Sequence, residues 1–461
     1  MNEITALFAW QLADKIRSQL LSPVEVVETH LRRIDQLNPS LNAIVTIAAD
    51  AVERAKEAET AVSRGDALGP LHGVPLTVKD TIETKGLRTT SGSAMRAGFI
   101  PEHDAPSVER LKAAGAIILG KTNTAEMAMN YTTDNPVFGR ANNPYDPLLT
   151  TGGSSGGEAA AIAACLSPGG IGSDLAGSIR IPSHFCGIAG LKPTVGRVPG
   201  GGQFPPSIGP YSLGASIGPM ARSVSDLHLL FNTLAGVETS SWAQTFEKRR
   251  ALMNGWRVSW YVDDGVSPVT EETRHALEAA AAALAGAGLI IEEARPPGIE
   301  QGHDLWLKLF SRASVVQLRN VYAGHEEKAG DFVRWRLATA DESPPPTLDD
   351  YISSWLVRDQ LRAKLVNWME SVPLILAPVG ATPAYEHGAH KVTVGERTIS
   401  TFRAFSYSQT FNVFDLPVVV VPAGRSSEGL PIGVQVIGRP FEEEAVLAAA
   451  AIIEEAGSDK P

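Results

Sequence analysis

Three residues of this chain have the types and settings that nucleophilic chemistry requires. Ser154 and Ser178 lie in glycine-rich segments, G-G-S-S-G-G and L-A-G-S, with no histidine between them. Lys79 ends the apolar run V-P-L-T-V-K upstream. A buried strand would carry this lysine into the interior, where desolvation lowers the pKa of an amine and lets it act as a general base. The pattern predicts a serine nucleophile that is activated by lysine and cleaves amide-like bonds.

Each of these residues also has a purely structural interpretation. Ser178 could be the N-cap of a helix. Lys79 could form an ion pair with Asp80 or Asp174. The segment around Ser154 could be a flexible linker, but linkers do not usually lead directly into an Ala-rich helix. We therefore favour a backbone held in an uncommon conformation beside a reacting group.

The glycine before the second serine would allow a tight turn that directs backbone amides toward one point. Four consecutive amides are candidates for such an oxyanion hole: Leu175, Ala176, Gly177 and Ser178. Four flanking residues are expected to support the two serine segments structurally: Gly153, Ser155, Asp174 and Arg180.

Three other patterns match known motifs only in part. Residues 115–122 fit the letters of a phosphate-binding loop, but their interior, Ala-Ile-Ile-Leu, is typical of a strand. The G-x-S-x-G pattern occurs twice within 152–157 and once at Ser216, which we place in a loop, so a Ser-His-Asp hydrolase is a weaker alternative. His387 and His390 lack a visible third ligand, and we expect no metal or cofactor.

The composition argues against several classes of function. The chain has 461 residues, of which 44% are hydrophobic and 20% charged, and its net charge is −11. An acidic surface does not suit nucleic acid binding, and no 18-residue apolar run predicts a membrane span. Cys165 and Cys186 form no C-x-x-C pair and the N-terminus resembles no secretory signal, so we expect a reduced, cytoplasmic location.

The periodicity predicts an α/β fold with a large, mostly parallel mixed sheet covered by helices on both faces. Residues 8–60 follow a helical pattern that Asn38-Pro39 should interrupt. Further helices are predicted at 106–114, 157–165 and 444–456. Strands are predicted at 73–79, 116–120, 170–173, 417–422 and 431–438. The Gly- and Pro-rich residues 196–219 should form a long ordered loop in the pocket wall.

We expect a single unit over residues 1–461. Within it, residues 60–240 should form the catalytic core and 240–370 a peripheral helical region that shapes specificity. Residues 371–461 should complete the core with strands and a closing helix.

The chain resembles the amidase signature family along nearly its whole length. The shared motifs are L-H-G-V-P-L-T-V-K-D, G-G-S-S-G-G, C-G-I-A-G-L-K-P-T, G-P-M-A-R-S-V-S-D and G-L-P-I-G-V-Q-V-I-G. Lys79, Ser154 and Ser178 match the family's Lys–cis-Ser–Ser triad, including the spacing of 24 positions between the serines. One departure lies in the nucleophile loop, where Leu175 and Ala176 replace threonine and glycine. Ala176 would be strained if its φ were positive.

The resemblance implies a single α/β/α unit, a non-proline cis peptide at Ser154, and hydrolysis through an acyl-enzyme without metal or cofactor. Lys79 would take a proton through Ser154 from Ser178, whose Oγ attacks the carbonyl. Four residues align with a segment that lines the acyl pocket, although the methionines among them would equally suit a packed core: Met127, Met129, Asn130 and Tyr131.

The expected substrates are small amides, esters or carbamates, processed by a monomer or homodimer without nucleic acid or membrane. One alternative is the A subunit of a tRNA-dependent amidotransferase, which would hydrolyse glutamine and depend on companion subunits. The tyrosine-rich segment typical of that subunit is not evident in residues 300–330. A non-catalytic protein that retains the fold is the other alternative, which the intact triad disfavours.

Overall fold

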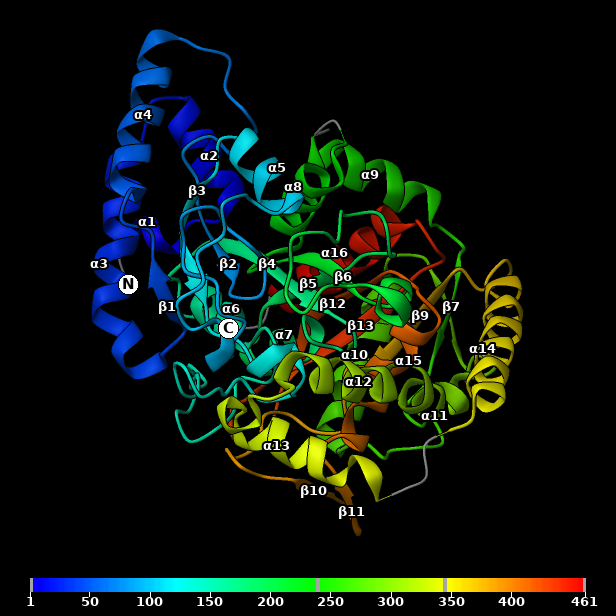
Figure 1. Cartoon of the computed structure of the whole chain (residues 1–461). Coiled ribbons are helices and arrows are strands. Elements are labelled where there is room, and N and C mark those ends of the chain that lie inside the picture. The colour runs from blue at the N-terminus through cyan, green and yellow to red at the C-terminus, as the bar shows by residue number, and fades with distance from the viewer. Residues whose placement is uncertain (1–2, 238–240, 343–345, 459–461) are drawn as a thin grey trace.

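A mixed sheet of eleven strands runs through the computed structural model, which describes residues 3–237, 241–342 and 346–458 (Figure 1). In spatial order the strands are β1 (Ile44–Ile47), β3 (Ile117–Thr122), β2 (Pro75–Lys79), β4 (Gly169–Asp174), β6 (Ser216–Ala221), β5 (Ala189–Lys192), β12 (Val418–Arg425), β13 (Pro431–Ile437), β9 (Leu374–Pro378), β7 (Arg257–Trp260) and β8 (Ile290–Glu293). The predicted α/β class with a large mixed sheet is confirmed.

Parallel and antiparallel pairing occupy different parts of this sheet. Strand β2 is parallel to β3 and β4, and β7 is parallel to β8 and β9, while the remaining neighbours, which include all pairs in the middle, are antiparallel. The β2–β3 connection contains helix α5 (Pro106–Ala113), as a parallel crossover requires. The β12–β13 connection is instead a tight turn closed by hydrogen bonds between Ser426 and Leu430. The alternation of strands and helices predicted from the sequence did not indicate that the strands in the middle of the sheet pair in antiparallel orientation.

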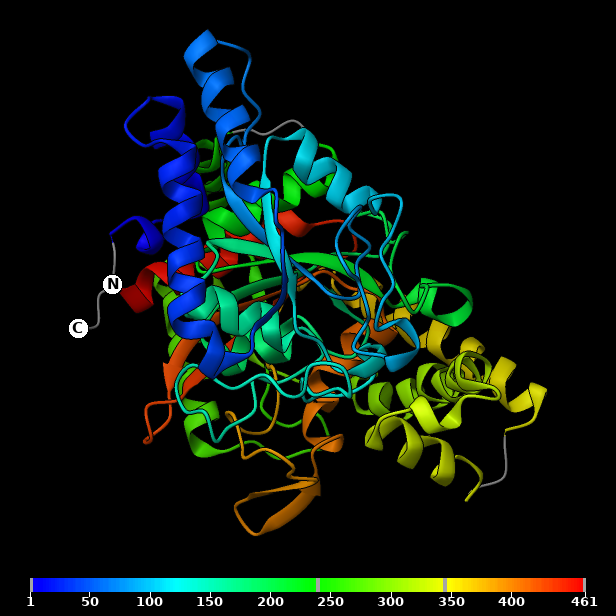
Figure 2. The same ribbon diagram turned by 60° about the vertical axis from the view of Figure 1, so that its left-hand side comes forward.

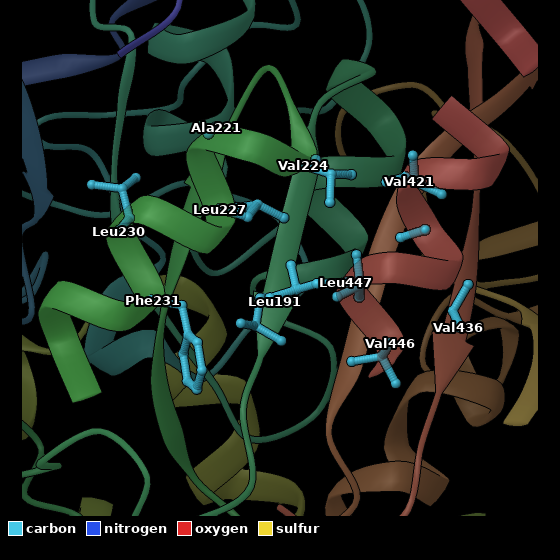
Figure 3. Close-up of a cluster of buried hydrophobic side chains, with 14 of the residues drawn as sticks. Leu191, Ala221, Val224, Leu227, Leu230, Phe231, Val421, Val436, Val446 and Leu447 are labelled. Carbon is cyan, nitrogen blue, oxygen red and sulfur yellow. The ribbon is translucent and has the colours of Figure 1, made fainter. Parts of the chain in front are cut away.

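Helices cover both faces of the sheet, because the four consecutive buried valines of β12 point alternately to the two faces and both faces are therefore apolar. Val419 and Val421 pack into one hydrophobic cluster, while Val418 and Val420 pack into another. The first face is covered by α8 (Val224–Ala235), α10 (Glu271–Gly286) and α16 (Glu443–Ser458). Figure 3 shows apolar side chains of α8 and α16 against the strands. The second face is covered by α6 (Gly156–Ala163), α7 (Arg180–Cys186) and α15 (Ser406–Val413). The candidate catalytic residues lie on this second face.

The N-terminal segment differs from its predicted helical pattern in two ways. Its helices are α1 (Glu3–Ala6), α2 (Ala9–Arg17), α3 (Pro23–Leu41) and α4 (Ala51–Arg64), with edge strand β1 between the last two. Helix α3 continues through Pro39 to Leu41 and is capped by Asn42, whose φ is 49°. The Asn38 side chain then accepts the backbone N–H groups of Ala43 and Ile44, at 2.9 and 2.8 Å. The predicted stop at Asn38-Pro39 is therefore wrong by three residues, and strand β1 was missed.

The segment between residues 240 and 370 contributes both strands and helices. Strands β7 and β8 extend the sheet, and α9 (Trp242–Leu252) packs against α8 and α16. A group of helices that we call the helical layer follows: α11 (Gly302–Trp306), a π-helical turn (Leu307–Ser311), α12 (Arg312–Tyr322), α13 (Asp331–Ala338) and α14 (Leu348–Trp368). Figure 2 shows its yellow-green helices on one side of the molecule, opposite the blue N-terminal helices.

Two smaller features complete the chain. Strands β10 (Lys391–Val394) and β11 (Arg397–Ser400) form a separate hairpin. Residues 196–208 form the expected loop, but Ser216 begins buried strand β6, so its placement in that loop is corrected. Within the three described ranges, no helix combines the length and apolar character needed to cross a membrane.

Candidate active site

Lys79 lies fully buried at the carboxyl end of β2, as its sequence context predicted. Its Nζ is 2.6 Å from Ser154 Oγ and 3.0 Å from Ser173 Oγ. Burial lowers the pKa of Lys79 to about 7, although the nearby carboxylates of Asp174 and Glu158 oppose this shift. Among the described residues, Lys79 has no ion pair with Asp80 or Asp174 within 4 Å, so that structural interpretation is wrong.

Ser154 follows a non-proline cis peptide bond after Gly153, as the family resemblance implied. The Ser154 carbonyl accepts hydrogen bonds from Thr124 Oγ1 at 3.0 Å and from the Ala125 N–H at 3.3 Å. A Cβ on Gly153 would lie 2.7 Å from the Asn130 carbonyl oxygen, so only glycine fits. The whole segment is buried and leads directly into α6, which excludes a flexible linker.

Ser178 lies in the loop between β4 and α7, beside the cis-serine segment. Its carbonyl accepts the Ser155 N–H at 3.1 Å, which joins the two glycine-rich loops. Helix α7 begins after Ile179, so Ser178 is not its N-cap. Gly177 has a φ of 105°, and a Cβ there would lie 2.7 Å from Ser408 Cβ. Ala176 is not among the residues with positive φ, so its extra methyl causes no backbone strain.

The predicted supporting pair Asp174 and Arg180 fixes this loop. The two side chains are fully buried and form a bidentate ion pair, with Nη2–Oδ1 at 2.8 Å and Nε–Oδ2 at 3.0 Å. Burial alone would raise the pKa of Asp174, but the Arg180 guanidinium outweighs it and holds that pKa below its ordinary range. Asp174 also accepts the backbone N–H groups of Gly177 at 2.9 Å and Ile179 at 3.1 Å.

The hydrogen bond from the Gly177 N–H to Asp174 changes the predicted set of oxyanion donors. Because the Gly177 N–H already donates to Asp174, its assignment to the oxyanion hole is corrected. The remaining candidates are the amides of Leu175, Ala176 and Ser178, and all three residues line the adjacent cavity. The tight turn at Gly177 therefore shapes the loop rather than supplying a donor.

A cavity opens beside Ser178 and has mostly apolar and aromatic walls. The predicted residues Met129, Asn130 and Tyr131 line it. Met127 does not line it: this residue packs with Leu318 and other core residues behind the wall, so the packed-core interpretation holds for Met127. Ala128 lines the cavity, and so does Tyr211, which lies within residues 196–219, the segment expected in the pocket wall. The remaining wall residues were not predicted and come from later in the chain: Trp306, Phe310, Ser311, Ser314, Leu318, Phe332, Arg336 and Phe402. The one sequence signal for any of these residues is the segment W-L-K-L-F, whose aromatic residues Trp306 and Phe310 are four positions apart and could lie on one face of a helix.

The residues of the phosphate-loop pattern form strand β3, as their apolar interior indicated. Lys121 is buried there and donates to the Ile82 carbonyl and to Thr84 Oγ1, the latter at 2.9 Å. Burial lowers the pKa of Lys121 to about 7. No group of three or more potential metal ligands occurs in the described part of the chain, so His387 and His390 lack a third partner there.

Buried Glu158 lies against strands β2 and β3, which carry the buried Lys79 and Lys121. Its carboxylate accepts hydrogen bonds from Thr77 Oγ1 at 2.5 Å and from Thr122 Oγ1 at 2.7 Å. Burial raises the pKa of Glu158 to about 7. This acidic first-turn residue of α6 therefore faces the sheet beneath the cis-serine segment, where its charge supports the protonated forms of Lys79 and Lys121.

Comparison with known proteins places this sequence and fold among amidases and related enzymes. The model of the family described as Amidase matches residues 25–447, and the chain therefore belongs to the amidase signature family of amidohydrolases. It is 32% identical to the A subunit of the Glutamyl-tRNA(Gln) amidotransferase from Geotalea daltonii, over 98% of both chains. It is 34% identical to the protein of the same name from Chloroflexus aurantiacus, over 93% of this chain and 92% of that protein.

Solved structures of amide hydrolases share the same fold. The structure of 6-aminohexanoate cyclic dimer hydrolase complexed with substrate is 28% identical, with a TM-score of 0.84 over 98% of this chain and 97% of that one. A bacterial aryl acylamidase of the amidase signature family is 27% identical, with a TM-score of 0.84 over 98% and 96% of the two chains.

Proposed function

We propose that this protein hydrolyses small, largely apolar amides through an acyl-enzyme, with Ser178 as the nucleophile. One observation carries the proposal: the buried Lys79 amine, with a pKa of about 7, lies 2.6 Å from Ser154 Oγ beside the loop that holds Ser178. A substantial fraction of this amine is neutral at neutral pH, which a general base requires.

The proposed steps use only side chains and backbone amides of this chain. Neutral Lys79 accepts the proton of Ser154, which in turn takes the proton of Ser178 as Ser178 Oγ attacks the substrate carbonyl. The loop amides of Leu175, Ala176 and Ser178 donate to the oxyanion. Ser154 then returns a proton to the leaving amine, and water attacks the acyl-enzyme to release the acid.

The cavity wall supports an apolar acyl group. Aromatic side chains from Tyr211, Trp306, Phe310 and Phe402 surround the space next to Ser178, and Met129 adds an adaptable surface. No acidic side chain lines this cavity among the described residues. We therefore place neutral amides with aryl or alkyl acyl groups first, and esters and carbamates of similar shape second.

A second candidate is glutamine hydrolysis as the A subunit of an amidotransferase. The 32% identity to such subunits over 98% of the chain favours it. Arg336 also lines the cavity and has no acidic partner within 4 Å among the described residues, so it could receive the carboxylate of glutamine. The ammonium group of glutamine would lack an acidic partner in this wall, and for this reason we rank the candidate second.

One panel of substrates separates these functions. The purified chain would be given chromogenic anilides, esters and carbamates, and separately glutamine, with Ser178→Ala as the inactive control. The proposal expects anilide turnover without any companion protein. The proposal would be overturned in favour of the second candidate if glutamine were the only substrate hydrolysed. It would also be overturned if hydrolysis occurred only when companion proteins were present.

A further inference from the structure

The cavity beside Ser178 has walls from several separate parts of the chain, which include residues 128–131 and the helical layer. Residues 128–131 supply the wall nearest the catalytic core. A second part of the wall, which we call the far wall, comes from the helical layer, where Leu318 lies on α12 and Phe332 and Arg336 lie on α13. The shape of the cavity therefore depends on how α12 and α13 are held against the core.

A buried carboxylate joins these two parts. Glu126 is 3% exposed and lies two residues before the core segment of the wall. Its Oε1 accepts a hydrogen bond from the Tyr322 hydroxyl at 2.6 Å, and Tyr322 is the last residue of α12. Its two oxygens also accept the backbone N–H of Gly330, at 3.1 and 3.0 Å, directly before α13. A single side chain of the core thus holds the end of one helix and the start of the next.

The surroundings of this carboxylate leave little freedom. A Cβ on Gly330 would lie 2.4 Å from Glu126 Oε2, so the close approach depends on glycine. Ser93 Oγ lies 2.6 Å from the Tyr322 hydroxyl. Because that hydroxyl donates its one hydrogen to Glu126, Ser93 must be the donor in this second bond. The two hydrogen bonds therefore run in one direction, from Ser93 to Tyr322 and from Tyr322 to Glu126, and this arrangement depends on the Glu126 carboxylate.

Apolar packing follows the same junction. Met127, next to Glu126 in sequence, packs with Leu318, Tyr322 and Val333 in one hydrophobic cluster. Glu126 itself does not line the cavity, so a substrate in the cavity would meet the helices it holds and not the carboxylate. An effect of Glu126 on substrate binding must pass through the position of α12 and α13.

We propose that Glu126 is a positioning residue that sets acyl-group specificity by holding α12 and α13 as the far wall of the cavity. The inference rests on the proposed amide hydrolysis at Ser178. It predicts that loss of this junction weakens binding of large acyl groups that reach the far wall. It also predicts that small acyl groups, which need only the catalytic loop, are little affected.

The test compares a small and a large substrate in the purified full-length protein. We would measure kcat and KM for acetyl and 4-phenylbutyryl p-nitroanilides with Glu126→Gln, Tyr322→Phe and the control Glu327→Gln, whose side chain is 69% exposed. Glutamine offers one acceptor oxygen where the carboxylate offers two. We expect KM for the large substrate to rise about tenfold or more in both test variants, with kcat for acetyl p-nitroanilide within about twofold of wild type.

Two outcomes would overturn the inference. One is an unchanged KM for the large substrate in Tyr322→Phe, which preserves the size of the side chain and carries the test if Glu126→Gln fails to fold. The other is an equal loss of kcat for both substrates, as general destabilisation would give. Failure of the proposed function is recognised separately, because the unaltered protein would then turn over neither of the two p-nitroanilides.

Discussion

The catalytic loops and the cavity wall are built in contrasting ways. The side chains that anchor the loops, those of Lys79, Asp174 and Arg180, are completely buried, and each is held by at least two hydrogen bonds. The wall contains half-buried Phe332 and Phe402, which belong to the helical layer and to the segment before α15. Rigid polar networks thus surround the reacting groups, while apolar residues from distant segments surround the space for substrate. Chemistry and specificity should therefore respond to different substitutions.

The largest expected effect is the loss of the nucleophile. Ser178→Ala should reduce turnover of any amide substrate by about 10⁴-fold or more, because no acyl-enzyme can form. Steady-state kinetics with an anilide would measure this. Ser216→Ala is the matched control, since Ser216 also lies in a G-x-S-x-G pattern but its buried Oγ has no hydrogen-bond partner among the described residues. Equal activity of Ser178→Ala and wild type would refute the assignment.

The general base gives the next largest effect. Lys79→Ala should lower kcat/KM by about 10²- to 10⁴-fold. In the unaltered protein, kcat/KM should rise with pH through about 7, because Lys79 must lose its proton before it can accept one from Ser154. A pH–rate profile measures both.

Lys121 supplies the control for this pH dependence, because the pKa of its buried amine is also about 7. Lys121→Met should change the thermal stability but keep the rise of kcat/KM near pH 7. If the rise disappeared in Lys121→Met and persisted in Lys79→Ala, the two roles would have to be exchanged.

The buried ion pair predicts a large effect on stability. Asp174→Asn would leave Arg180 buried without its counter-charge, which should lower the free energy of unfolding by about 3–5 kcal/mol. Urea denaturation would measure it. The exposed pair of Arg54 and Asp50 provides the comparison, and Arg54→Gln should cost at most about 0.5 kcal/mol. Similar losses from both variants would contradict the expected difference between a buried and an exposed ion pair.

The smallest expected effect lies where the two regions meet. Trp306 lines the cavity and its Nε1–H donates to the Leu175 carbonyl at 3.0 Å, within the proposed oxyanion loop. Trp306→Phe keeps an aromatic wall but removes this bond, and kcat should fall about two- to tenfold. Trp335→Phe, at a side chain exposed by more than half, should leave kcat unchanged. A change in KM alone for Trp306→Phe would assign this residue to the wall only.

The sequence predicted the catalytic loops better than the cavity, and the reason is physical. Ser154, Ser178 and Lys79 sit in short segments where glycines, a buried strand and a helix start determine the local geometry. The far wall depends on how α12 and α13 pack against residues 128–131, and such packing has no local pattern. The hydrogen bond from the Gly177 N–H to Asp174 likewise depends on where the Asp174 side chain points. The spacing of residues in the sequence does not indicate that direction.

The fold shows the same division. The strongly apolar strands β12 and β13 and the helix α16 were predicted closely. Strands β1, β7 and β8 were not predicted. Strand β1 has only four residues and lies between two helices, and β7 and β8 lie in a segment whose composition indicated helices. Short strands depend on pairing with distant neighbours, so their own residues carry little signal.

The central claim is that a neutral, buried Lys79 amine drives the reaction, and direct titration of that amine tests it. Lysine-selective NMR of the ε-methylene group, assigned with Lys79→Arg and with Lys121→Met in parallel, would follow its ionisation in the resting protein. The account predicts that Lys79 titrates near pH 7. A Lys79 amine that stays protonated up to pH 10 would contradict it.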